Sequence, residues 1–124
     1  MERTRTTIEE LAFKIAELDL ALRQAGFDLV LADPAASRDF SYRGTYMRRK
    51  STLFPRLQAN LEYYLATKSF SLKIIADDPS IDPSAAKPYY CLVKSYKGSL
   101  KELLDRYFES MRKGVPLMLG STQT

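Results

Sequence analysis

The stretch TIEELAFKIAELDLALRQAG, residues 7–26, carries the clearest structural pattern in this chain. Thr7 and Glu10 have the spacing of a capping box, in which each side chain satisfies a free backbone N–H of the other's turn. Gly26 suits the position after a helix because glycine adopts left-handed dihedral angles at little cost. The large aliphatic residues between them recur three or four positions apart, as on one face of a helix. The segment predicts a helix over residues 8–25, with this apolar face: Ile8, Leu11, Ile15, Leu18 and Leu22.

A second segment near the C-terminus repeats this pattern. Ser99 and Glu102 form another capping box, and Gly114 and Pro116 end the periodic stretch. The sequence therefore predicts a helix over residues 100–113. Its broad apolar face consists of Leu100, Leu103, Leu104, Tyr107, Phe108 and Met111.

The middle of the chain is less regular, but helical spacing recurs there too. Phe54, Leu57, Leu61 and Leu65 predict a helix over residues 53–67. A further helix is expected over residues 88–97, where Pro88 fits the first turn and Gly98 breaks the pattern.

Residues 35–50 have two interpretations. Asp33-Pro34 is typical of a helix start, so the whole segment is a candidate helix. Gly44 disfavours a continuous helix, so a helix that ends near it and leads into a basic loop is an equal alternative.

These patterns predict an all-α fold, a small bundle of about four helices that forms a single domain over residues 1–124. The alternative is a small α/β fold with short strands near residues 27–32 and 70–75. Both of these short runs are apolar, and periodicity alone does not distinguish a strand from a buried helical turn.

The composition supports an ordinary folded domain. Hydrophobic residues make up 45% of the chain and charged residues 27%, so a sizeable core is expected. No apolar run approaches the roughly 20 residues that cross a bilayer, and the polar start lacks the apolar region of a signal peptide. A cytoplasmic protein without membrane contact is expected. The single cysteine, Cys91, agrees with this location and is expected in the core.

The chain contains no histidine, which excludes Ser-His-Asp and Cys-His catalytic arrangements and ordinary zinc sites. Three acids, Asp77, Asp78 and Asp82, lie close together, and such carboxylates are possible ligands of Mg²⁺. The prolines and serines among them are more typical of a turn. We therefore expect no enzyme activity, no cofactor and no metal site.

Charge is concentrated in residues 38–56, where six cations face one acid, Asp39. The segment carries +5, against +4 for the whole chain. Most of its cations are arginines, whose planar guanidinium suits phosphate oxygens, and tyrosines between them are able to stack on bases. The predicted nucleic-acid-binding residues are Arg38, Tyr42, Arg43, Tyr46, Arg48, Arg49, Lys50 and Arg56.

Two tyrosine pairs, Tyr63-Tyr64 and Tyr89-Tyr90, add aromatic surface. Neighbours on a helix point about 100° apart, so one ring of each pair is expected in the core and the other at the surface. An exposed ring of this kind is a second candidate for base stacking.

Together these features predict a non-enzymatic nucleic-acid-binding helical subunit. It would contact the sugar–phosphate backbone of DNA or RNA, single-stranded or duplex, with little sequence specificity. In architecture alone, a basic helical bundle of this size resembles the small subunits of CRISPR effector complexes. That resemblance implies a place in a larger ribonucleoprotein complex, with protein partners or further copies of the chain. The alternative is a protein-interaction adaptor or regulator that binds an acidic or apolar protein partner.

Overall fold

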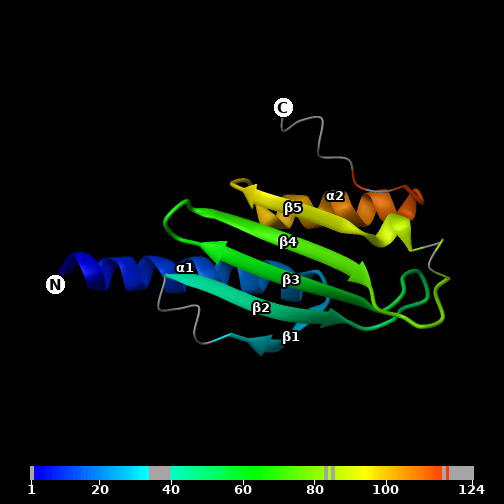
Figure 1. Ribbon diagram of the computed structural model, residues 1–124, viewed down its shortest axis with the longest axis horizontal. Helices are drawn as coiled ribbons and strands as arrows, with labels where there is room; N and C mark the ends of the chain where they lie inside the picture. The colour runs from blue at the N-terminus through cyan, green and yellow to red at the C-terminus, as the bar shows by residue number, and fades with distance from the viewer. Residues whose placement is uncertain (1, 34–39, 83, 85, 116, 118–124) are drawn as a thin grey trace.

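In the computed structural model, the described residues are 2–33, 40–82, 84, 86–115 and 117. Two long helices pack against one antiparallel sheet, whose strands lie side by side in the order of the sequence (Figure 1). The elements of this described part are α1 (Glu2–Gln24), β1 (Phe27–Ala32), β2 (Ser41–Arg48), β3 (Leu57–Tyr64), β4 (Ser69–Ala76), the 3₁₀ turn η3 (Lys87–Tyr89), β5 (Cys91–Tyr96) and α2 (Leu100–Arg112).

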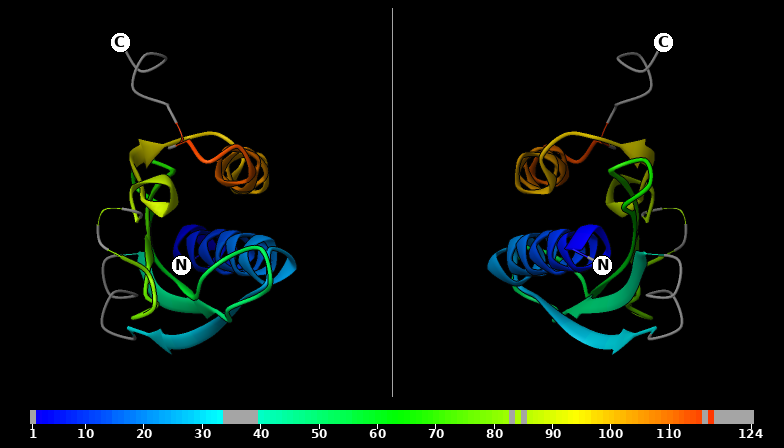
Figure 2. Two further views of the ribbon diagram at one scale, coloured as in Figure 1. Left: turned by 90° about the vertical axis from the view of Figure 1, so that its right-hand side faces the viewer. Right: turned by 90° about the vertical axis from the view of Figure 1, so that its left-hand side faces the viewer.

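Both long helices lie on the same side of the sheet. Figure 2 shows α1 and α2 side by side against one face, while the opposite face has no helix across it. We call the covered face the inner face and the other the outer face. Within the described residues, neither helix is long and apolar enough to cross a membrane.

The predicted all-α fold and helical bundle are wrong, because the middle of the chain forms strands. The predicted helix over 53–67 is replaced by β3, in which Leu57, Ala59, Leu61 and Tyr63 are all buried on the inner face. Leucines four residues apart satisfy a period of 2 as well as a helical period. The residues halfway between them decide the matter, because Ala59 and Tyr63 are also buried.

Two other expected helices are also strands. The candidate helix over 35–50 is replaced in part by β2, which spans residues 41–48. The helix start predicted at Pro34 lies within residues 34–39, which are outside the described residues. The predicted helix over 88–97 is replaced by η3 and β5. The α/β alternative fits better, since strands stand at 27–32 and 69–76, where it expected them.

The two terminal helices are confirmed. The helix α1 begins at Glu2, so Thr7 lies inside it and the capping box predicted there is wrong. Gly26 follows the helix at φ 94°, a left-handed conformation that glycine allows. The helix α2 starts at Leu100 as predicted, and the Ser99 hydroxyl accepts the backbone N–H of Glu102 at 3.3 Å, which is one of the two hydrogen bonds of the predicted capping box.

One core lies between the helices and the inner face. The deepest side chains of α1 and α2 include Leu18, Leu22, Leu103 and Tyr107. Cys91 is buried there too, as predicted, and burial raises the pKa of its thiol to about 11. An unreactive thiol in the core follows.

Candidate functional site

The strand β2 splits the arginine-rich segment between the two faces of the sheet. Side chains alternate along a strand, and the cross-strand pairs with β3 put Tyr42, Tyr46 and Arg48 on the inner face. Arg43 belongs to the opposite set and lies on the outer face, opposite Glu62. The residues predicted as one binding surface therefore do not form one.

Tyr46 is a core residue. Its ring is 0% exposed, and its hydroxyl donates to the Asp19 carboxylate at 2.8 Å. The Tyr42 and Tyr46 hydroxyls also lie 2.8 Å apart and share a hydrogen bond. Burial, together with these hydrogen bonds, raises the pKa of Tyr46 well above its ordinary value. This tyrosine joins β2 to α1 and has no surface on which a base stacks.

Arg48 holds the end of α1 in place. Its Nε donates to the carbonyl of Ala25 at 3.0 Å, and its guanidinium carbon lies 5.4 Å from the Phe54 ring centroid and 5.2 Å from that of Phe108. A cation at the C-terminal end of a helix is stabilised by the helix dipole and by free carbonyls. Within the described residues its Nη1 is buried without a hydrogen-bond partner. The Arg48 side chain therefore stabilises the contact between the end of α1, Phe54 and Phe108.

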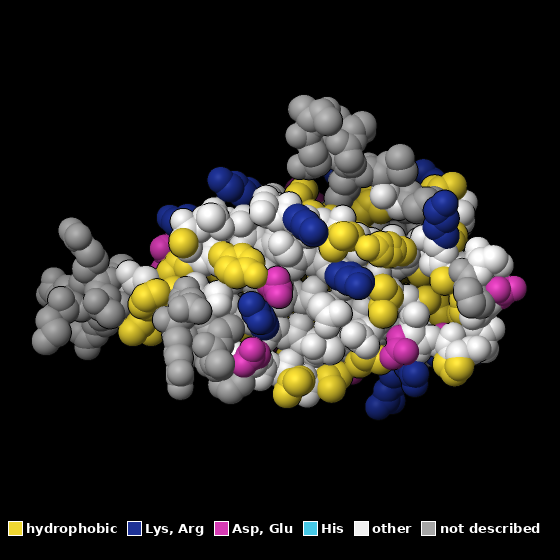
Figure 3. Space-filling model, viewed as in Figure 1, with side chains coloured by type: hydrophobic (Ala, Val, Ile, Leu, Met, Phe, Trp, Pro, Cys, Tyr) yellow, Lys and Arg dark blue, Asp and Glu magenta, His cyan; other side chains and the backbone are white. Residues whose placement is uncertain are grey.

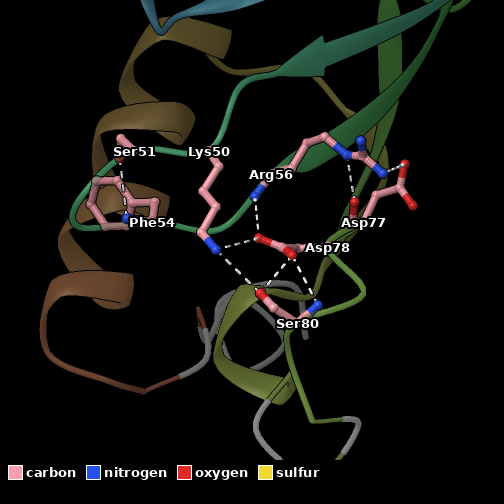
Figure 4. A network of polar contacts seen from close by, with 7 residues as sticks. All are labelled: Lys50, Ser51, Phe54, Arg56, Asp77, Asp78 and Ser80. Atoms are coloured by element: carbon pink, nitrogen blue, oxygen red, sulfur yellow. Dashed lines mark hydrogen bonds and ion pairs between the residues drawn. The ribbon is translucent and has the colours of Figure 1, made fainter.

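Lys50 and Arg56 bind the acidic turn that follows β4 (Figure 4). The Lys50 Nζ lies 3.7 Å from the Asp78 Oδ2, and the Arg56 Nε donates to the Asp77 carbonyl at 2.6 Å. The Asp78 side chain is 7% exposed, and hydrogen bonds from Ser80 lower the pKa of its carboxyl to about 2. The acids thus neutralise part of the basic segment.

The predicted turn over these acids is confirmed. Asp78 accepts hydrogen bonds from both the backbone N–H and the hydroxyl of Ser80, at 3.0 and 2.7 Å, which closes the turn locally. Among the residues that the structure describes, no group of three potential metal ligands comes together here or elsewhere.

Few of the predicted cations remain available at the surface. Arg43 is exposed but lies 3.5 Å from the Glu62 carboxylate. Arg49 is exposed and has no ion pair within the described part of the chain. Arg38 lies outside the described residues.

The outer face carries two lysines that sequence reasoning missed, Lys73 on β4 and Lys94 on β5. Figure 3 shows this face, with basic side chains in dark blue and acidic ones in magenta among them. Both lysines are exposed, and neither has an acidic partner within 4.0 Å among the described residues. They flank a shallow hollow of about 330 Å³. Its lining consists of Asn60, Glu62, Ser71, Leu72, Lys73, Leu92 and Lys94. Strand alternation within 69–76 and 91–96 was the signal that would have found them.

A second hollow of about 270 Å³ adjoins the first on the outer face and shares Asn60 and Glu62 with it. Arg43, Gly44 and Thr45 of β2 line it as well, together with Leu31 of β1 and the acid Asp33 that follows β1. At the end of β3, the Tyr64 hydroxyl donates to Glu62 at 2.8 Å, so its partly exposed ring lies over the same face. In the pair Tyr63-Tyr64, Tyr63 is buried and Tyr64 is partly exposed, so the predicted split is confirmed, but alternation along a strand and not a helix produces it.

The outer face is thus an open antiparallel sheet with two adjoining hollows, which are lined by cations, the Asn60 amide, hydroxyls and the Glu62 carboxylate that both share. The ring of Tyr64 lies on the same face at the end of β3. No protein-family model, curated protein or solved structure gives a significant match to this chain. The described residues form a small domain in which two helices cover one face of a five-stranded antiparallel sheet and leave the other face open.

Proposed function

We propose that this protein binds the phosphate backbone of single-stranded nucleic acid on the outer face of its sheet, without catalysis. The observation that carries the proposal is the position of Lys73 and Lys94. They flank one hollow and have no acidic partner within 4.0 Å among the described residues. The Glu62 carboxylate in the same lining pairs with Arg43 at 3.5 Å, so the charge of the two lysines is available to a polyanion. Phosphate contacts of this kind supply affinity and little sequence information.

A single strand fits this face better than a duplex. An exposed sheet is a surface on which proteins stack unpaired bases and hold the extended backbone. The ring of Tyr64 is partly exposed there, and Asn60 provides an amide beside the hollow. Within the described residues, no helix crosses the outer face to enter a major groove.

The proposal revises the predicted binding residues. Arg43 and Arg49 stay as candidate phosphate contacts, while Tyr46, Arg48 and Lys50 have structural partners instead. With the helical bundle gone, the resemblance to CRISPR small subunits has lost its basis. A cytoplasmic location and membership of a larger complex remain part of the proposal.

The test is a fluorescence anisotropy titration of random single-stranded oligonucleotides over a range of salt concentrations. Each phosphate contact contributes about −0.7 to the log–log salt slope. Lys73→Glu/Lys94→Glu is expected to abolish binding at moderate salt. Its matched control is Lys101→Glu/Arg106→Glu, which makes the same change of net charge at exposed positions of α2.

Two outcomes would overturn the proposal. The wild-type protein fails to bind any single strand even at low salt, or the α2 control loses as much affinity as the outer-face variant. The second result would mean that net charge, and no particular face, attracts the nucleic acid.

A further inference from the structure

The helix α1 exposes apolar side chains that the fold does not use. Ile8, Phe13 and Leu20 are 54%, 77% and 55% exposed, and Ala12 and Ala16 between them are exposed as well. Ile8, Ala12, Ala16 and Leu20 are four residues apart, so they form one ridge along the helix, with Phe13 beside it.

The ridge is not needed to attach α1 to its own sheet. A different side of the helix, which carries Leu11, Leu18 and Leu22, is buried in the core. The N-terminal turns of α1 also extend beyond the end of the sheet (Figure 1). An exposed apolar row that is separate from the core face is typical of an interaction surface.

The ridge from Ala12 to Leu20 is complementary to itself when two copies run in opposite directions, and Ile8 then comes level with Gln24 of the other copy. Ala12 and Leu20 lie four residues on either side of Ala16, and Glu9 and Arg23 lie seven residues on either side. Seven residues are within about 20° of two full turns, so Glu9 and Arg23 point nearly the same way as Ala16. In an antiparallel pair of helices that cross at Ala16, a residue that precedes Ala16 by a given number of positions lies level, along the helix axis, with the residue of the other copy that follows Ala16 by the same number.

We propose that two copies of this chain associate through α1, antiparallel, about a two-fold axis at Ala16. Leu20 of each copy then fills the space above the small Ala12 of the other, and Glu9 of each faces Arg23 of the other. Such an isologous contact repeats every favourable pair twice. The alanines at the centre allow the two helices to approach closely.

Charge selects a second copy over an unrelated partner. The same side of α1 carries Glu9 towards one end and Arg23 towards the other, in the arrangement that an antiparallel copy neutralises, and Arg23 also pairs with Asp19 of its own chain. A contact between two helices is smaller than the roughly 1,200–2,000 Å² of a standard interface, so the dimer is expected to be weak and dependent on concentration. Because α1 covers the inner face, the dimer leaves both outer faces open, and the inference is independent of the proposed function.

The test is sedimentation velocity of the full chain over about a hundredfold range of concentration, with charge-swapped variants. Glu9→Arg and Arg23→Glu each place like charges opposite one another twice, and each is expected to weaken the dimer at least about tenfold. Combining the two is expected to restore dimerisation to within about threefold of the wild type. Arg23 also pairs with Asp19 of its own chain at 2.7 Å. Arg23→Glu and the combined variant both lose the ion pair with Asp19. The stronger dimerisation of the combined variant relative to Arg23→Glu therefore measures only the contact between the two copies.

A second pair of variants tests the centre of the interface. Ala16→Glu brings two carboxylates together at the axis and is expected to leave a monomer. Ala66→Glu, at an exposed alanine in the β3–β4 turn, is the control and is expected to dimerise like the wild type. Circular dichroism checks that all variants keep the fold. A wild-type protein that is monomeric throughout, or a dimer that the charge swaps do not affect, would contradict the proposal.

Discussion

The two faces of the sheet use the same kinds of residue for opposite purposes. On the inner face, Tyr46 and Arg48 of β2 are held by Asp19, Ala25 and two phenylalanine rings. On the outer face, Lys73 and Lys94 have no such partners among the described residues. Position relative to the pleat, and not residue type, decides whether a cation or a tyrosine stabilises the fold or stays available to a ligand.

Arg48 and Arg49 show this difference between adjacent residues. Arg48 ends β2 on the inner side and packs under Phe54 and Phe108, whereas Arg49 follows it into the exposed connection to β3. Two neighbouring residues therefore differ in role: Arg48 stabilises the fold, and the charge of Arg49 is available to a ligand. Variants on the two sides of this boundary test the comparison directly.

The largest effect is expected from emptying the inner face. Leu61→Ala removes a side chain that is 1% exposed at the centre of β3 and is expected to lower the free energy of unfolding by about 2–5 kcal/mol. Lys73→Ala on the outer face of β4 is the control, with an expected change within about 0.5 kcal/mol. Urea denaturation measures both. Equal losses at the two positions would mean that both faces are packed.

A smaller effect is expected from Arg48→Ala, at about 1–3 kcal/mol. The change removes the hydrogen bond to the Ala25 carbonyl and the contacts with two rings. Arg49→Ala is the matched control, because it loses the same charge from an exposed position, and its change is expected to stay within about 0.5 kcal/mol. If both variants unfold at the same urea concentration as the wild type, the structural role of Arg48 is wrong.

The smallest effect is expected from Tyr46→Phe, which keeps the ring and removes the hydroxyl that donates to Asp19. A loss of about 0.5–1.5 kcal/mol is expected near neutral pH. In the folded state the pKa of Tyr46 is raised, so the folded protein keeps a proton that the unfolded chain loses above about pH 10. The stabilisation is complete below that pH and is lost as the pH rises further.

The pH dependence sharpens this test. The free energy of unfolding of the wild type is expected to fall between about pH 10 and 11, and Tyr46→Phe is expected to fall less steeply. Tyr107 contributes to the remaining decrease, because burial raises its pKa as well. Cys91, Tyr63 and Tyr64, whose pKa values are also raised, contribute in the same way. The control is Tyr90→Phe, at an exposed tyrosine. If the free energy of unfolding of Tyr46→Phe falls as steeply with pH as that of the wild type, the raised pKa of the Tyr46 hydroxyl is contradicted.

The comparison also explains which predictions from the sequence succeeded. The helices at both ends were identified because their apolar residues follow spacings of three and four over several turns, a pattern that a strand does not produce. The acidic turn was identified from its prolines, serines and aspartates. In β3, the spacing of Leu57 and Leu61 fits both periods, so a helix was predicted there with Tyr64 beside the leucines, whereas Tyr63 is the buried ring.

The candidate site was predicted poorly for a related reason. The binding surface was predicted from the number of charges in residues 38–56, on the assumption that neighbouring residues share one surface. In a strand, neighbouring side chains lie on opposite faces of the sheet. The lysines of the outer face come from β4 and β5, which are far from the basic segment in sequence and are brought close only by strand pairing.

By itself, the sequence determined the two helices, the acidic turn and the burial of Cys91, because local periodicity, turn chemistry and hydrophobicity act over a few residues. Only the tertiary structure decided that the middle of the chain is a sheet, that Arg48 packs while Arg49 is exposed, and that Lys73 and Lys94 share a hollow. These outcomes depend on cross-strand register and on which face the helices cover, and both are set by contacts between residues distant in sequence.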